Sequence, residues 1–420
     1  MNDFEKLYRA NEEWNRIDPS LYAKYRVKSG LRNENGTGVK VGLTKISDVI
    51  GYQIVNGNKQ NLPGRLIYRG YDIEELISLR EEHHFGYEMT AFLLIFGKLP
   101  THRQLLDFHK ELIKIANAES VNIHYQPSNL LNAIQIDVLK LYSQDKDPDT
   151  DTLEERMRKG LYILASMPLF MLSHYKKEKI TKYPLPDKGI AENVLCIIKG
   201  NTHYTQREAD VLDILFMLHA DHGGGNNSTF TNVVMSSTGT DIYSCISAAL
   251  GSLKGPRHGG ANIKTNAMFE AIIKEIGITT NQKALRTIAK RLLEKDFFDR
   301  SGLIYGIGHA IYTKSDPRCQ VIKQAGKLLA REKDAMDQYH FLEAFEAAAL
   351  YQMRKIKHVE TCANVDYYSG FTYSLLGIQD NLFTPLFGMA RTAGWVAHHL
   401  ENRQNNRKLI RPANVYVGQR

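Results

Sequence analysis

Apolar residues recur with helical spacing along most of the chain. Segments 242–253, 321–330 and 341–354 carry apolar residues at i, i+3, i+4 and i+7, the period of an amphipathic helix. Runs in which apolar and polar positions alternate are few and short, and the best of them, 51–55 and 65–68, lie near the N-terminus. The pattern therefore predicts a mainly α-helical protein with a small β element around residues 40–70.

Residues that favour helix boundaries support this interpretation. Asp316-Pro317 and Thr384-Pro385 each read as an N-cap followed by a first helical residue, and they open helices predicted to continue to about residues 330 and 403. The glycines at 223–225 are expected to end a helix that includes residues 211–222.

Length and composition narrow the class of protein. A chain of 420 residues exceeds the roughly 250–300 residues at which a single core stops growing, so two domains are expected. The longest apolar stretch, 160–172, is too short for a bilayer span and contains Pro168. The N-terminal residues carry mixed charge and no apolar run, so we expect no membrane association and a cytoplasmic location.

Charge and cysteine usage exclude further classes. The 54 basic and 46 acidic residues give a net charge of +8, and the basic residues form no long run. Proteins that bind nucleic acid usually carry a basic stripe or a recognition motif, so this class is disfavoured. The four cysteines are scattered without CxxC spacing, which argues against a disulfide framework and a zinc ribbon.

Three histidines stand beside glycines and are candidates for chemistry. They are His222 in HADHGGG, His258 in GPRHGG and His309 in GIGHA. Glycine neighbours allow a ligand or a second backbone to come close. One such histidine is most simply a satisfied polar group at a helix end, but three independent cases favour a functional site.

Two other kinds of site are disfavoured by spacing. His219 and His222 form HxxH without the following glutamate and the i, i+4 spacing of helical zinc proteases, so no metal site is expected. The stretch Gly306-Ile307-Gly308 begins like a dinucleotide fingerprint, but position 311 is Ile where that fingerprint requires Gly.

Three charged residues lie in unusual contexts. Arg318 places a cation in the first turn of a helix, which is unfavourable unless an anion is held there, although an exposed side chain would explain it equally well. Arg391 is flanked by glycines at i−3 and i+3, which suggests a planar anion or a buried carboxylate partner. Asp366, among apolar and aromatic neighbours, would have a raised pKa that suits a general base, or would bind nearby backbone.

Several blocks together resemble the citrate synthase family. The resemblance runs in the family's order from about residue 40 to the C-terminus, and it is specific because so many blocks occur together. The blocks read LPGRLIYRGYDIEEL, AFLLIFGKLP, LHADHGGGNNSTFTNVV, SAALGSLKGPRHGGAN, GIGHAIYTKSDPR, ANVDYYSG, FTPLFGMARTAGWVAHHLE and IRPANVYVG.

The resemblance implies a two-domain helical fold that works as a homodimer or a larger assembly. The large domain would comprise 1–260 and, after the chain returns, 376–420, which includes a C-terminal arm. The small domain on the coenzyme A side would comprise 261–375 and close over the substrate. No regulatory domain with an NADH site is expected.

The resemblance also implies roles for individual residues. His258 would stabilise the enol of the thioester, Asp366 would take a proton from the acyl α-carbon, and His309 would polarise and protonate the oxaloacetate carbonyl. The ligands of oxaloacetate would be His222, Arg318, Arg391 and, from the partner subunit, Arg411. Coenzyme A would lie along Leu303, Ile304, Tyr305, Gly306, Ile307 and Gly308. Thr313 stands where some relatives carry a phosphate-binding Arg, and Lys314 is expected to compensate.

The implied reaction is the condensation of acetyl-CoA with oxaloacetate and water to citrate and CoA. Acetyl-CoA is then a co-substrate, and no permanently bound cofactor is expected. Two alternatives stay open. One is a 2-methylcitrate synthase that uses propionyl-CoA, because one methylene in a pocket discriminates by only about 1–3 kcal/mol. The other is an inactive paralogue that binds CoA or another metabolite.

Overall fold

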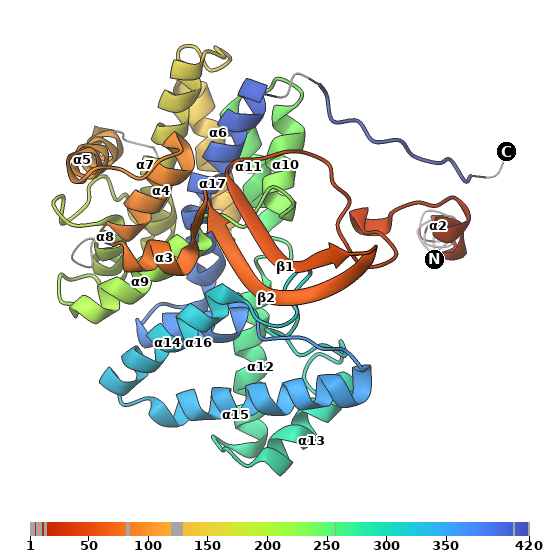
Figure 1. Ribbon diagram of the computed structural model, residues 1–420. Helices are drawn as coiled ribbons and strands as arrows, with labels where there is room; N and C mark the ends of the chain where they lie inside the picture. The colour runs from red at the N-terminus through yellow and green to blue at the C-terminus, as the bar shows by residue number, and fades with distance from the viewer. Residues whose placement is uncertain are drawn as a thin grey trace. The chain divides into compact units, whose positions relative to one another are not determined.

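A computed structural model of the chain, shown in Figure 1, describes residues 15–80, 85–118, 129–256, 258–405 and 408–418, together with Glu5 and Asn11. The chain divides into two compact units, of which the larger is Thr44–Leu409. The smaller combines Met1–Leu43 with Ile410–Arg420. In the smaller unit lie helix α2 (Ser20–Lys24) and the 3-10 turn η1 (Ser29–Leu31).

The larger unit begins with a β-hairpin. Strands β1 (Ser47–Val55), β2 (Asn58–Tyr68) and β3 (Tyr71–Asp72) form an antiparallel sheet in the order β1-β2-β3. Asn56 and Gly57, which connect β1 to β2, both have positive φ, as a two-residue hairpin turn requires. The small β element predicted near the N-terminus is confirmed.

Helices make up most of the rest of the larger unit. The helices before residue 260 are α3 (Ile73–Ser78), α4 (Gly86–Phe96), α5 (His102–Ala118), α6 (Leu130–Gln144), α7 (Leu153–Lys176), α8 (Ile190–Lys199), α9 (Gln206–His219), α10 (Asn227–Ser236) and α11 (Ile242–Leu253). The later elements are α12 (Ala261–Ile276), α13 (Gln282–Leu293), α14 (Pro317–Glu332), α15 (Met336–Gln352), the short turn η3 (Met353–Lys357), α16 (Val365–Leu375), the short turn η4 (Asp380–Leu382) and α17 (Phe383–Asn405). The prediction of a mainly helical fold is confirmed.

One of the three expected helix boundaries is found where predicted, and two differ. Helix α14 begins at Pro317, and the Asp316 carboxylate caps it, as predicted. Helix α9 ends at His219, so it stops before residue 222. Thr384 lies inside α17, which begins at Phe383, rather than capping it, and its hydroxyl donates to the Gly259 carbonyl at 3.0 Å.

Helix α17 runs through the interior of the larger unit, where α4, α7, α9, α10 and α11 pack around it (Figure 1). Small residues allow this close approach. A Cβ atom at Gly160 of α7 would come within 2.7 Å of Val396, and one at Gly388 would come within 3.2 Å of Leu250 and Leu253. Because α17 is buried along most of its length, Arg391 on it is held away from water.

Helices α12 to α16 form a second group, drawn below α17 and the hairpin in Figure 1. Within this group α13 packs on α15, and α16 packs on α12 and α14. Helix α14 also contacts α3, α9 and β2 of the first group. Its N-terminus therefore lies where the two groups meet.

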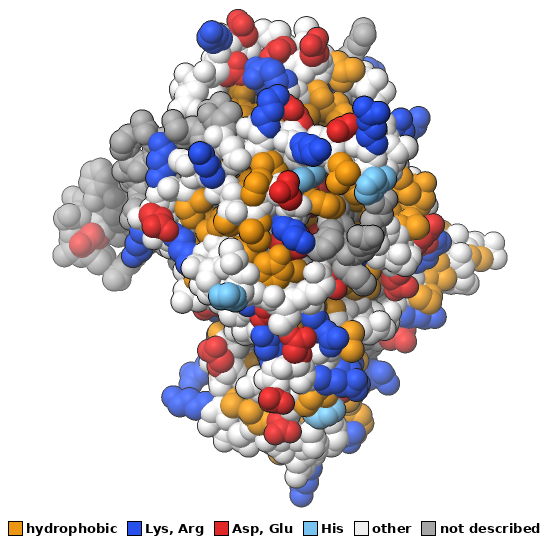
Figure 2. Space-filling model, turned by 90° about the vertical axis from the view of Figure 1, so that its left-hand side faces the viewer, with side chains coloured by type: hydrophobic (Ala, Val, Ile, Leu, Met, Phe, Trp, Pro, Cys, Tyr) orange, Lys and Arg blue, Asp and Glu red, His pale blue; other side chains and the backbone are white. Residues whose placement is uncertain are grey.

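The surface carries mixed charge. On the face shown in Figure 2, Lys and Arg side chains are interspersed with Asp and Glu, and apolar side chains lie between them. Within the described ranges, no helix is both long and apolar enough to cross a bilayer.

Replacing Leu250 by Ala should lower the free energy of unfolding by about 2–5 kcal/mol, because its side chain is 0% exposed and faces the glycine contact with α17. Ile54→Ala is the matched control, since Ile54 is 50% exposed, and its effect should stay within about 0.5 kcal/mol. Urea unfolding of both variants checks this. Equal midpoints would contradict the close packing of α11 against α17.

Candidate active site

Three aromatic rings meet between the two groups of helices. His222, three residues after the end of α9, lies edge-on to His309, with ring centroids 5.2 Å apart. Tyr312 stacks on His309 at 4.7 Å and presents its edge to His222 at 5.7 Å. His309 and Tyr312 belong to the loop that leads into α14, so the cluster joins segments distant in sequence.

The backbone fixes the protonation of His309. Its Nδ1 accepts hydrogen bonds from the N–H groups of Ile311 and Tyr312, both at 3.1 Å. A nitrogen that accepts from two donors carries no proton, so the neutral ring keeps its proton on Nε2. His309 can therefore donate a hydrogen bond through Nε2.

Arg391 is a buried cation that is only partly satisfied. Its Nε donates to the His219 carbonyl at 2.6 Å, and its guanidinium lies 4.6 Å from the Phe387 ring centroid. Its Nη1 and Nη2 have no hydrogen-bond partner among the described residues. Burial lowers its pKa to about 10, which still leaves it charged at neutral pH. Buried N–H groups of this kind are costly unless an acceptor reaches them, so the site suits an anion.

Arg318 has a partner within the chain. Its Nε and Nη2 donate to the two carboxylate oxygens of Asp316, at 3.0 and 2.7 Å. Asp316 also accepts the N–H of Val365 at 3.2 Å, so it ties the start of α14 to the start of α16. The anion expected beside Arg318 is thus, in this structure, the carboxylate of Asp316, which also caps α14. The guanidinium lies 5.7 Å from the Tyr312 ring and faces the histidine cluster.

Asp366 lies in the first turn of α16, whose N-cap is Asn364. Burial raises the pKa of Asp366, Arg318 lowers it and Asp316 raises it, and the net pKa is about 7. A carboxyl group that titrates near neutrality can exchange a proton with a weakly acidic group. The raised pKa expected from its apolar neighbours is found.

His258 is held by Ser228. The His258 Nε2 lies 3.1 Å from the Ser228 hydroxyl, which also accepts from the Trp395 indole N–H at 3.3 Å. The same hydroxyl lies 2.9 Å from the Asn226 side-chain oxygen. Burial and, to a smaller extent, the charge of Arg391 lower the pKa of His258 to about 4, so this ring is neutral at pH 7.

One electrostatic effect links these residues. Burial lowers the pKa of His222 well below its usual range, and its Nε2 has no hydrogen-bond partner among the described residues. Four further side chains are near enough to lower this pKa again: Arg318, His309, Arg391 and His258. The structure thus brings together five of the predicted site residues, with Asp366 beside Arg318.

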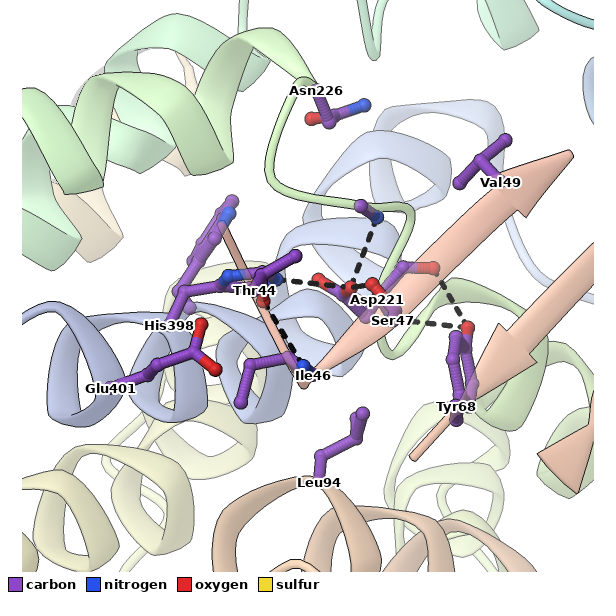
Figure 3. A network of polar contacts seen from close by, with 12 residues as sticks. Thr44, Ile46, Ser47, Val49, Tyr68, Leu94, Asp221, Asn226, His398 and Glu401 are labelled. Carbon is purple, nitrogen blue, oxygen red and sulfur yellow. Dashed lines mark hydrogen bonds and ion pairs between the residues drawn. The ribbon is translucent and has the colours of Figure 1, made fainter. Parts of the chain in front are cut away.

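Asp221 anchors the turn that carries His222 (Figure 3). Ser47 donates to its carboxylate, His398 lies 3.2 Å from the same oxygen, and the Tyr68 hydroxyl donates to its carbonyl at 2.7 Å. Burial raises the pKa of Asp221, but the charge and hydrogen bond of His398 outweigh burial, and the net pKa lies below the usual range. A charged, fully buried carboxylate therefore fixes the backbone next to His222.

The predicted coenzyme A loop lies against the segment that precedes α16. Asn364 donates its backbone N–H to the Gly306 carbonyl at 2.8 Å and its side-chain amide to the Gly308 carbonyl at 2.7 Å. Gly306 has φ of +80°, and a Cβ there would come within 3.0 Å of the Tyr367 backbone. Within the loop, Ile307 pairs with the same segment, Ile304 is buried, and the Tyr305 hydroxyl donates to Asp299 at 2.6 Å.

The remaining predicted residues lie at the surface. Leu303 and Lys314 are exposed. Arg411 is also exposed and belongs to the smaller unit. Among the described residues, no three His, Cys, Asp or Glu side chains gather in a way that could hold a metal ion.

Four residues that shape the site were not among those predicted from the sequence. Asp316 was recognised only as a helix cap, although its position two residues before Arg318 was a usable signal. Asp221 lies in the HADHGGG block, and an acid beside His222 was equally visible. Tyr312 and Ser228 carry no signal of their own, because their roles depend on partners far away in the sequence.

Comparison with known proteins identifies the family. The sequence profile described as "Citrate synthase, C-terminal domain" matches residues 33–413. The chain belongs to the citrate synthase family. The likeness covers the fold and every block that carries the clustered residues.

Relatives in this family carry two names. Citrate synthase of Haloferax volcanii is 31% identical over 369 residues, covering 85% of this chain and 90% of that protein. 2-Methylcitrate synthase 2 of Corynebacterium glutamicum is 33% identical over 369 residues, covering 84% of this chain and 89% of that protein. A solved ternary complex of Thermoplasma acidophilum citrate synthase with carboxymethyl coenzyme A and oxaloacetate shares the fold, with a TM-score of 0.74, 24% identity and coverage of 94% and 97%. The protein is thus an acyltransferase of this family whose acyl group the comparisons leave open.

Asp366→Asn should stabilise the protein at high pH. Because the pKa of Asp366 is raised to about 7 in the folded chain, the folded state binds its proton more tightly than the unfolded state does. Its contribution to stability therefore falls as the pH rises from about 4 to about 7. The variant should unfold at a higher temperature than the wild type at pH 8, and the difference should vanish near pH 4. Asp337→Asn, at an exposed carboxylate, should show little pH dependence; equal curves for both variants would contradict the raised pKa.

Proposed function

We propose that this protein condenses acetyl-CoA with oxaloacetate and water to give citrate and CoA. The observation that carries the proposal is Arg391, a buried guanidinium whose two terminal nitrogens have no partner among the described residues and lie beside a cluster of histidines. A small dianion with a polarisable carbonyl fits this arrangement. The Thermoplasma acidophilum relative is described in complex with oxaloacetate and a coenzyme A analogue, which supports the same assignment.

The proposed first step is enolisation. Asp366 removes a proton from the acyl α-carbon, and His258 donates a hydrogen bond to the thioester oxygen. A neutral imidazole is suited to this role, and burial keeps His258 neutral. Ser228 holds the ring through Nε2, and a neutral imidazole keeps one N–H with which to donate to the thioester.

The proposed second step forms the carbon–carbon bond. The enol carbon attacks the oxaloacetate carbonyl carbon, and the Nε2–H of His309 protonates the carbonyl oxygen as the bond forms. Water then cleaves the thioester and releases CoA. The Nδ1 contacts of His309 support this role, because they hold the donor nitrogen in one tautomer.

Oxaloacetate would be held by charge-assisted hydrogen bonds. Arg391 would pair one carboxylate through its two terminal nitrogens, and Arg318 would approach the substrate with the edge that Asp316 leaves uncovered. His222 would contribute its Nε2. Arg411 would come from a partner subunit of a homodimer.

Acyl-CoA would be bound by the segment 303–308, with Lys314 at the phosphates in place of the Arg that Thr313 replaces. The small domain, 261–375, would close over the large domain, 1–260 and 376–420, and exclude water until the new bond forms. Because relatives include both citrate and 2-methylcitrate synthases, propionyl-CoA is the second candidate substrate.

Thiol release from acetyl-CoA and from propionyl-CoA, each with and without oxaloacetate, tests the proposal. We expect oxaloacetate-dependent release with a higher kcat/KM for acetyl-CoA, and at least about 10²-fold lower turnover for Asp366→Asn. Faster release from propionyl-CoA would make the protein a 2-methylcitrate synthase. Binding of both ligands by the wild type without thiol release would indicate an inactive paralogue.

Arg411→Ala and His309→Ala should each be inactive alone and recover activity when mixed and reassembled. A hybrid dimer would contain one site with both defects and one with neither, if Arg411 completes the partner's site. Each variant reassembled with itself is the control. If subunits exchange without recovery, Arg411 does not act across the interface.

A further inference from the structure

One end of the β1–β2 hairpin is fixed to the loop that carries His222. Ser47 of β1 and Tyr68 of β2 are paired in the hairpin register, and both bind Asp221 (Figure 3). The Tyr68 hydroxyl also accepts the Asp221 N–H at 3.1 Å. The two strands therefore hold the residue next to His222 from both sides.

The middle of the hairpin is irregular. The register shifts between Ile50 and Tyr52, so that Gly51 of β1 faces a longer stretch of β2 that includes Pro63 and Gly64. Such bulges bend a hairpin and redirect its surface, and the strands curve visibly in Figure 1. The bend brings both glycines against the loop 309–317.

The contact between hairpin and loop is one of backbone against backbone. A Cβ at Gly51 would lie 2.5 Å from the Ile311 carbonyl oxygen, and one at Gly64 would overlap the Ser315 carbonyl oxygen. Gly64 donates its N–H to the Ser315 hydroxyl at 3.0 Å, and the Tyr312 hydroxyl donates to the Arg65 carbonyl at 3.2 Å. No flexible side chain lies between these carbonyls and the two glycines, so none can move aside when a methyl group is added at either glycine.

The loop held in this way lies between His309 and Arg318. Tyr312 transmits the contact, because its ring stacks on His309 and lies beside the Arg318 guanidinium. The same hairpin thus contacts the segment next to His222 at one end and the segment that carries His309 at its bend.

We infer that the β1–β2 hairpin sets the spacing between the two halves of the site, and that Gly51 and Gly64 are positioning residues for oxaloacetate. Neither glycine has positive φ, so the reason for glycine here is steric. A methyl group at either position must push the loop 309–317 away, because Asp221 tethers the hairpin. The consequence for catalysis rests on the proposed function, in which His222 and His309 share one substrate.

The test compares Gly51→Ala and Gly64→Ala with Gln60→Ala, an exposed position on β2 whose side chain contacts Gln53 across the hairpin. Hydrogen exchange of the peptide 309–317 without substrate should accelerate by at least about tenfold in both glycine variants. In the same variants kcat/KM for oxaloacetate should fall by at least about tenfold, since small misplacements of reacting groups are costly. Gln60→Ala should match the wild type in both measurements.

If a glycine variant fails to fold, Tyr312→Phe tests the same contact between hairpin and loop. It removes only the hydroxyl that binds the Arg65 carbonyl, and it should raise exchange of 309–317 and the KM for oxaloacetate by roughly fivefold. Wild-type exchange in the variants that fold would overturn the inference. If the wild type releases no thiol, the proposed function fails, and hydrogen exchange alone decides the role of the hairpin.

Discussion

A buried guanidinium with unsatisfied donors is the constraint on which this site depends. Arg391 is 0% exposed, and its terminal nitrogens find no partner among the described residues. Leaving charged N–H groups unpaired in a low-dielectric interior is unfavourable, and an anionic ligand that reaches them recovers that free energy. Burial lowers the pKa of the imidazoles of His222 and His258, and the charge of Arg391 adds to this effect, so both rings are neutral at pH 7.

The fold supports this arrangement through close contact of backbones. Gly394, one turn after Arg391 on α17, donates its N–H to the Ala220 carbonyl at 3.0 Å, and a Cβ there would overlap the Asp221 carboxylate. The turn that carries His222 therefore lies directly on α17. The hairpin holds the same turn from the other side, through Ser47 and Tyr68 (Figure 3).

The two arginines of the site are held in different ways. Arg318 is neutralised by Asp316 on one edge, whereas Arg391 makes no ion pair among the described residues: its Nε donates to the His219 carbonyl and its face lies against Phe387. An anion that enters the site thus meets Arg318, which is already paired with Asp316, and Arg391, whose terminal nitrogens are available. Asp316 also touches the start of α16, so the carboxylate that positions Arg318 lies beside the residue whose pKa is raised to about 7, Asp366.

Much of the fold followed from the sequence by itself. Periodicity, helix caps and blocks that resemble the citrate synthase family predicted a mainly helical chain, a small β element and a set of candidate residues, because these signals are local. The contacts of Ser228 with His258, of Ser47 and Tyr68 with Asp221, and of Gly51 and Gly64 with the loop 309–317 were decided only by the tertiary structure. These features arise from contacts between residues up to about 250 positions apart, as between Gly64 and Ser315 (separation 251), and no local pattern records which distant groups will meet.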